Sequence, residues 1–258
     1  MNVRALAAEA IGTFILVLMG SLGVATAIIA TGGQDPTVII LIIVPFAFGL
    51  GLLAAIAIAG ETSGGHFNPA VTLAALFDSR LGWVDAIGYV IAQVFGAVAA
   101  SLTIRLVLTQ NFVAATVNRA GNTAADATTA QIHAFATEVL LTTIFIAVIL
   151  TVTKRAPSAA IFVIPLTLVA IHYAGILISG ASVNPARSLG PAVVSGDYDG
   201  LWVYVTAPFA GSIIGWGIYR LFNSPDDDVD ELDEADDDDL DDLDDLDDLD
   251  DQLSDAQG

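Results

Sequence analysis

Two short segments of this 258-residue chain combine glycine, asparagine and proline in the same order. The first reads SGGHFNPAV from residue 63 and the second SGASVNPAR from residue 179, and five of their first eight positions are identical. Asparagine is a favoured helix N-cap, and proline is favoured at the first helical position. Each segment therefore predicts a helix start beside an asparagine amide that can donate hydrogen bonds to a small polar molecule. The residues concerned are Asn68, Pro69, Ala70, Asn184, Pro185 and Ala186.

The apolar stretches that follow these helix starts are short. NPAVTLAALF ends at residue 77 and NPARSLGPAVV ends at residue 194. At a rise of about 1.5 Å per residue, about ten residues cover roughly 15 Å, which is half of a hydrocarbon core of about 30 Å. A single copy is well explained as an ordinary capped helix, but two copies in matching places predict a pair of re-entrant half-helices. Their irregular lead-in backbone is tolerated at membrane depth where it lines a water-filled cavity.

Three charged residues stand out because their surroundings are apolar. Arg187 directly follows the second Asn-Pro-Ala, and Glu9 and Glu138 each lie near the start of an apolar run. Ionisable groups inside a membrane are costly and usually mark a pathway. Arg187 is therefore a candidate for contact with a permeating molecule; a structural arginine paired with a carbonyl or carboxylate is the alternative. The glutamates are candidates either for proton transfer or for support of nearby backbone.

Six apolar runs must position these residues. The chain is 55% hydrophobic with a mean hydropathy of +0.73. Each run is long enough to cross a bilayer, which takes a helix of about 20 residues. The predicted fold class is an all-α integral membrane protein. The runs cover about 5–30, 37–60, 84–108, 131–152, 159–179 and 200–222.

The six runs divide into two repeats, about 1–110 and 131–222. Each repeat has three runs, one glutamate near its start and one Asn-Pro-Ala segment. Because three is an odd number of spans, the second repeat must enter the membrane from the opposite side. Inverted repeats of this kind place their functional site near the bilayer midplane. We therefore expect six transmembrane helices and two half-helices around a central site.

Acidic residues are concentrated at the C-terminal end. The net charge is −21, but 20 of the 29 acidic residues lie in 226–258, and 1–225 holds the other nine together with all eight Lys and Arg. We interpret 1–225 as the membrane domain and 226–258 as a cytoplasmic tail, because long runs of like charge are usually disordered. A regulatory, cation-responsive tail is the alternative. The acidity also hints at a halophilic prokaryote, since molar salt screens repulsion beyond about 3 Å.

Basic residues in the short loops indicate the orientation. Five of them fall on one side of a six-span arrangement and two fall on the other. In membrane proteins the cytoplasmic loops carry the larger number of Lys and Arg residues. Both termini are therefore predicted to be cytoplasmic, in an integral protein of the cell membrane. The five are Arg4, Arg80, Lys154, Arg155 and Arg220, and the two are Arg105 and Arg119.

Several chemistries have no support in the sequence. The chain has no cysteine, which excludes disulfides and thiolate metal sites. It also shows no cluster of metal-ligating residues, no catalytic constellation and no glycine-rich phosphate loop. We therefore expect neither an enzyme nor a protein that uses a cofactor, a metal or a nucleic-acid partner.

Over about 1–222, the two Asn-Pro-Ala segments, the two helix-start glutamates and the inverted repeat resemble the aquaporins of the major intrinsic protein family. The resemblance implies that 1–225 forms a channel domain. It also implies a pore in each subunit of a homotetramer embedded in membrane lipid. In this arrangement Glu9 and Glu138 accept hydrogen bonds from the backbone of the re-entrant loops.

The resemblance further implies which residues line the pore. A selectivity filter near the outer mouth is expected to contain Phe48, His172, Ala181 and Arg187. Backbone carbonyls that replace lost hydration are expected from Gly64, Gly65, His66, Gly180, Ala181 and Ser182.

A Phe–His–Arg constriction resembles the water-selective branch of the family, and Ser188 lies where glycerol channels usually carry aspartate. Two features differ from that branch, because Ala181 is smaller than the Cys or Thr common there and Val205 replaces a frequent tryptophan. The implied function is passive water conduction with exclusion of protons and ions. The alternatives are a broader channel for neutral solutes such as glycerol, ammonia or hydrogen peroxide, and an ion-coupled transporter that uses the two glutamates.

Overall fold

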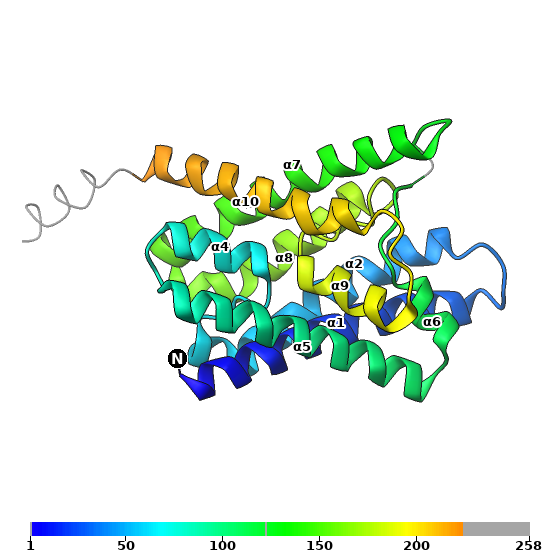
Figure 1. Cartoon of the computed structure of the whole chain (residues 1–258), viewed down its shortest axis with the longest axis horizontal. Helices are drawn as coiled ribbons and strands as arrows, with labels where there is room; N and C mark the ends of the chain where they lie inside the picture. Colours follow the sequence, from blue (N-terminus) through cyan, green and yellow to red (C-terminus); the bar gives the residue numbers. More distant parts are fainter. Residues whose placement is uncertain (1, 122, 224–258) are drawn as a thin grey trace, which may run out of the picture. The chain divides into compact units, whose positions relative to one another are not determined.

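The computed structural model of the chain describes residues 2–121 and 123–223, which are helices joined by short connections (Figure 1). Six helical segments among them are long and apolar enough to cross a membrane, and each coincides with one of the apolar runs. The predicted all-α membrane class is therefore confirmed, whereas the predicted tail, 226–258, lies outside the described residues. The spans are α1 (Val3–Ala30), the segment made of α2 (Thr37–Ala55), η1 (Ile56–Gly60) and α3 (Glu61–Ser63), then α5 (Trp83–Val107), α7 (Ala127–Arg155), α8 (Pro157–Gly175) and α10 (Leu201–Phe222).

Two short helices follow the Asn-Pro-Ala segments. α4 (Pro69–Phe77) has nine residues and α9 (Pro185–Ser195) has eleven, so neither is long enough to cross a bilayer. Each begins with its proline and is capped by the preceding asparagine. The asparagine side-chain oxygen accepts a hydrogen bond from the backbone N–H of Ala70 in α4, at 2.8 Å, and of Ala186 in α9, at 3.0 Å. Both predicted half-helices are present.

The connections differ in places from what the sequence predicts. A short helix, α6 (Gln110–Ala115), follows α5 in a segment where no element is expected. α8 ends at Gly175, although the apolar run continues to residue 179, because the chain turns there toward α9. The second span contains a π-helical turn, η1, just before α3 and the first Ser-Gly. Single π-helical turns inside longer helices are frequent at functional sites.

Small residues let the helices pack closely. α1 packs against α2 and α5, and α5 also packs against α9 (Figure 1). At Gly96 of α5, a Cβ atom would come within 2.2 Å of the Ala10 carbonyl oxygen of α1, so only glycine fits. The half-helices contact α1, α5 and α7 in a bundle that comprises residues up to Tyr219. This packing holds the Asn-Pro-Ala segments inside the bundle, where Asn68 and Asn184 are buried.

The outward faces of the long helices are apolar. Ile91 of α5 and Phe162 of α8 are 66% and 60% exposed, and many other large apolar side chains are exposed along the spans. A surface of this kind suits contact with lipid and agrees with an integral membrane protein.

Candidate functional site

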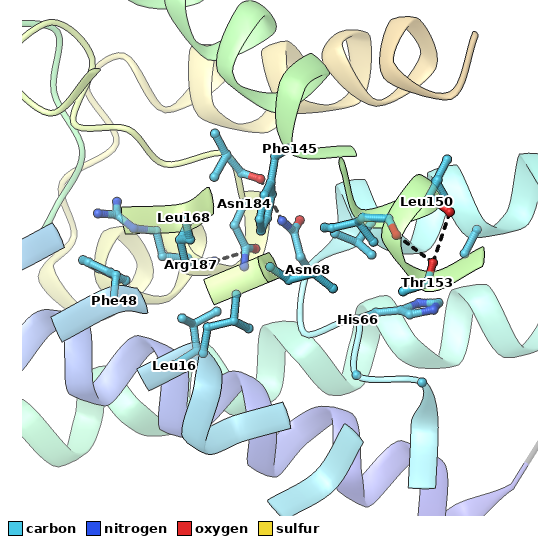
Figure 2. Close-up of a pocket in the computed structure, with 18 of the residues that line it drawn as sticks. Leu16, Phe48, His66, Asn68, Phe145, Leu150, Thr153, Leu168, Asn184 and Arg187 are labelled. Atoms are coloured by element: carbon cyan, nitrogen blue, oxygen red, sulfur yellow. Dashed lines mark hydrogen bonds between the residues drawn. The ribbon is translucent and has the colours of Figure 1, made fainter. Parts of the chain in front are cut away.

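A narrow central cavity runs past the N-terminal ends of both half-helices (Figure 2). The centres of water molecules can occupy about 80 Å³ of it, several times the roughly 10–15 Å³ that one water needs. Figure 2 shows the two asparagines in its middle, Phe48 and Arg187 toward one end, and His66 and Thr153 toward the other. Much of the remaining wall is apolar and includes Leu16, Leu52, Val71, Phe145, Leu150 and Leu168.

The two half-helices meet at their asparagines. Asn68 donates a hydrogen bond from Nδ2 to the carbonyl of Val183 at 2.7 Å, and Asn184 donates from Nδ2 to the carbonyl of Phe67 at 2.9 Å. An amide nitrogen carries two hydrogens, so each asparagine keeps one N–H for a molecule in the cavity. The N-terminus of each half-helix adds about half a positive charge. The middle of the cavity therefore favours hydrogen-bond acceptors and opposes cations.

The residue before each asparagine has an unusual backbone conformation. Phe67 has a φ of 48° and Val183 has a φ of 47°, in the left-handed region that bulky and β-branched residues rarely adopt. In this conformation the N–H of each residue donates to a buried glutamate, while its carbonyl accepts from the opposite asparagine. A residue held in this region costs about 1–3 kcal/mol and persists only because its surroundings fix it.

Glu9 and Glu138 are the buried glutamates that contact these loops. The carboxylate of Glu9 accepts hydrogen bonds from the backbone N–H groups of His66 at 3.0 Å and Phe67 at 2.7 Å, and from the hydroxyl of Ser63 at 2.6 Å. Glu138 makes the equivalent contacts in the second repeat. These are with the N–H groups of Ser182 at 2.8 Å and Val183 at 2.7 Å, and with the hydroxyl of Ser179 at 2.7 Å.

Gln93 extends the first of these networks and was not singled out from the sequence. Its Nε2 donates to Glu9 at 2.7 Å and lies 2.9 Å from the hydroxyl of Thr72 in α4. It therefore connects α5 with both α1 and the half-helix. A polar amide inside the apolar run 84–108 is the sequence signal that could have revealed it, and the structure places Gln93 fully buried.

Three of the four residues expected in the filter come together at one end of the cavity. The rings of Phe48 and His172 are stacked, with centroids 4.6 Å apart and planes inclined by 18°. The guanidinium carbon of Arg187 lies 4.5 Å from the centre of the Phe48 ring, within cation–π distance. His172 is oriented by a hydrogen bond from Nδ1 to the Leu168 carbonyl at 2.9 Å. The constriction thus has aromatic walls beside a cationic one.

The fourth expected residue, Ala181, is placed differently. It is fully buried within the hydrophobic core and is absent from the described residues that line the cavity. Its place in the filter therefore stays a prediction. Gly180, which is also expected to present a carbonyl, lines a neighbouring pocket that shares Arg187 with the central cavity. The residues expected to present carbonyls that do line the central cavity are Gly64, Gly65, His66 and Ser182.

Asn118 fixes Arg187 and was also missed from the sequence. Its side-chain oxygen accepts hydrogen bonds from Nη1 of Arg187 and from the hydroxyl of Ser188, the latter at 2.8 Å. Its Nδ2 donates to the carbonyl of Gly180 at 3.3 Å. Asn118 lies between α6 and α7, in a connection without a motif or hydrophobic period, so no sequence signal points to it.

Comparison with known proteins agrees with this architecture. The family model described as Major intrinsic protein matches residues 1–219. The chain is 38% identical to Glycerol uptake facilitator protein-like 6 of Lactiplantibacillus plantarum, over 85% of this chain and 98% of that protein. It is also 38% identical to Aquaporin Z of Photorhabdus laumondii, over 84% of this chain and 96% of that protein.

A solved structure supports the same fold. The aquaglyceroporin from Plasmodium falciparum superposes with a TM-score of 0.73 at 24% identity, covering 85% of this chain and 96% of that one. Members of the matched family are passive channels and not enzymes. From its Asn-Pro-Ala half-helices, its six spans and these matches, the chain belongs to the major intrinsic protein family of membrane channels.

Proposed function

We propose that this chain conducts water passively through the central cavity and excludes protons and ions. The observation that carries the proposal is the constriction, in which the stacked rings of Phe48 and His172 face the guanidinium of Arg187. We expect the passage between this stacked pair and Arg187 to leave little room for a solute wider than water. Arg187 adds hydrogen-bond donors for a neutral permeant and repulsion for a cation.

The two asparagines explain how water passes while protons do not. The second N–H of Asn68 and that of Asn184 both donate to the oxygen of one water molecule. The hydrogens of that water then point outward to its neighbours, so the chain of hydrogen bonds reverses direction in the middle of the pore. A proton cannot hop through such a reversal, and the positive ends of α4 and α9 oppose hydronium itself.

A broader channel for neutral solutes is the second candidate. Relatives named for glycerol uptake and for water are equally similar to this chain, at 38% identity each. Ala181 favours this candidate if it belongs to the filter, because it is smaller than the Cys or Thr common at that position and would leave the filter wider. Glycerol, ammonia and hydrogen peroxide are the solutes to compare with water.

An ion-coupled transporter is the third candidate and has less support. Glu9 and Glu138 would have to exchange protons, but their carboxylates already accept hydrogen bonds from loop backbone and serine hydroxyls. These contacts favour structural support. Coupled transport would saturate and depend on an ion gradient, whereas channel flow would do neither.

We further propose that the channel is a homotetramer in the lipid of the cell membrane with both termini in the cytoplasm. The charge distribution of the short loops supports this orientation. A halophilic prokaryotic source remains part of the same proposal, because the acidic segment 226–258 suits high salt.

The proposal is tested by stopped-flow light scattering on proteoliposomes of the full chain, with water and glycerol gradients measured on the same vesicles. We expect fast water flow with a low activation energy, and glycerol entry close to that of empty vesicles. Glycerol entry as fast as water flow would instead establish the broader neutral-solute channel.

Gly20 of α1 sets the position of the Phe48 ring and offers a second test. A Cβ atom at Gly20 would lie 2.2 Å from Phe48 Cε1, so alanine must displace the ring, and we expect the ring to move toward the constriction. We expect the displaced ring to narrow the constriction and Gly20→Ala to lower water permeability per channel by about tenfold, which corresponds to about 1.4 kcal/mol in the barrier. Gly217→Ala is the matched control, because a Cβ there meets open space. Wild-type flow through the Gly20 variant would mean that the ring moves away from the pore.

A further inference from the structure

A second arginine lines the cavity at the end opposite Arg187. Arg80 follows α4 in a tight turn, in which Ser79 has a φ of 58° and the N–H of Arg80 donates to the Ala75 carbonyl at 2.9 Å. The turn directs the chain back toward the cavity, and Arg80 is among its lining residues. Its partner Thr153 lies at the end of the cavity away from Phe48 and Arg187 (Figure 2).

The Arg80 side chain is held by several parts of the bundle at once. Nη1 donates to the hydroxyl of Thr153 at 2.6 Å and Nη2 donates to the carbonyl of Leu150 at 3.1 Å, both in α7. Nε donates to Asp78 at 2.8 Å. The ring of Tyr219 in α10 lies 5.7 Å from the guanidinium carbon. A side chain anchored in this way keeps its charge at a fixed place on the cavity wall.

The charge of Arg80 faces a cavity without acidic groups. A guanidinium remains charged at every pH at which a protein works. The carboxylate of Asp78 contacts Nε, whereas the two contacts toward α7 are with neutral oxygen acceptors. Among the described residues that line the cavity, Arg80 and Arg187 carry the permanent charges, and neither Asp nor Glu occurs. A cation that crosses the cavity must therefore pass one arginine at each end.

We propose that Arg80 is a second selectivity residue, which excludes cations electrostatically at the end of the pore opposite Arg187. This inference rests on the proposed function, because it requires that the cavity is the conduction path. When two barriers lie in series along the pore, the higher barrier limits the flow of cations. The contribution of Arg80 is therefore measured best after the barrier at Arg187 has been removed.

The experiment compares proton leak into proteoliposomes that contain trapped pyranine, with potassium and valinomycin present to dissipate the membrane potential. In an Arg187→Val background at low salt, Arg80→Gln is expected to raise the leak by about fivefold, whereas Arg80→Lys leaves it unchanged. The difference should largely vanish in 1 M salt, where the Debye length is about 3 Å. Arg4→Gln in the same background is the matched control, because Arg4 does not line the cavity.

A second variant, which makes the local charge more positive, tests the inference if Arg80→Gln does not fold. Asp78→Asn removes the neighbouring negative charge while keeping an oxygen that accepts from Nε, and it is expected to lower the leak by about twofold. An unchanged leak in Asp78→Asn, or a rise in Arg80→Gln that does not depend on salt, overturns the inference. If wild-type proteoliposomes show no more water flow than empty vesicles, the proposed function itself is refuted. The two failures are therefore distinguishable.

Discussion

Replacing Arg187 with valine is expected to admit glycerol and protons while water flow persists. The substitution removes a positive charge and an ionised hydrogen-bond donor from the constriction beside Phe48. The lost repulsion lowers the barrier for a cation by about 4 kcal/mol at a distance of about 4 Å, and the shorter valine side chain widens the passage for glycerol; about 1.4 kcal/mol already corresponds to a tenfold change in rate. We therefore expect glycerol permeability and proton leak to rise by at least about tenfold. Stopped-flow light scattering measures the first, and trapped pyranine measures the second.

Two control variants separate the charge of Arg187 from its shape. Arg187→Lys retains the charge but loses the planar donor arrangement, so it should exclude protons better than glycerol. Arg105→Val removes an arginine from the exposed surface of α5 and should change neither permeability. If glycerol is still excluded by Arg187→Val, the stack of Phe48 and His172 sets the size cutoff by itself.

Replacing Glu138 with alanine is expected to produce the largest loss of stability. The N–H groups of Ser182 and Val183 and the hydroxyl of Ser179 would lose their acceptor inside the bundle. A buried donor without a partner costs about 1–3 kcal/mol, so the three donors together cost about 3–9 kcal/mol. The left-handed backbone of Val183 would also lose the contact that fixes it. Thermal unfolding of purified protein in detergent should show a midpoint lower by about 10 °C.

Glu138→Gln and Leu140→Ala are the matched comparisons for this prediction. Glutamine keeps one acceptor oxygen but places an amide N–H₂ opposite backbone N–H groups, so an intermediate loss is expected. Leu140 is on the same helix but is 63% exposed, and its truncation should leave the midpoint unchanged. An unfolding midpoint of Glu138→Ala equal to the wild type would show that the second lead-in loop is fixed by other contacts.

The elements of this fold could be predicted from the sequence because their signals are local. A span needs about 20 consecutive apolar residues, and a half-helix start needs a cap and a proline at adjacent positions. Both can be recognised without knowledge of the remaining chain. The repeat of Asn68-Pro69-Ala70 at Asn184 then determined the inverted arrangement. α6 escaped prediction because a six-residue helix between two spans carries too little periodic pattern.

The details of the site were decided by tertiary structure, because they join residues that are far apart in the chain. The amide of Asn68 reaches the carbonyl of Val183 only when the two repeats face each other. Asn118 fixes Arg187 because the connection before α7 packs against the first turn of α9, where it contacts Arg187 and Ser188. The sequence by itself thus determined the helices and the two asparagines. Packing between distant segments decided which side chains meet in the pore, since that depends on how the helices pack and not on any local pattern.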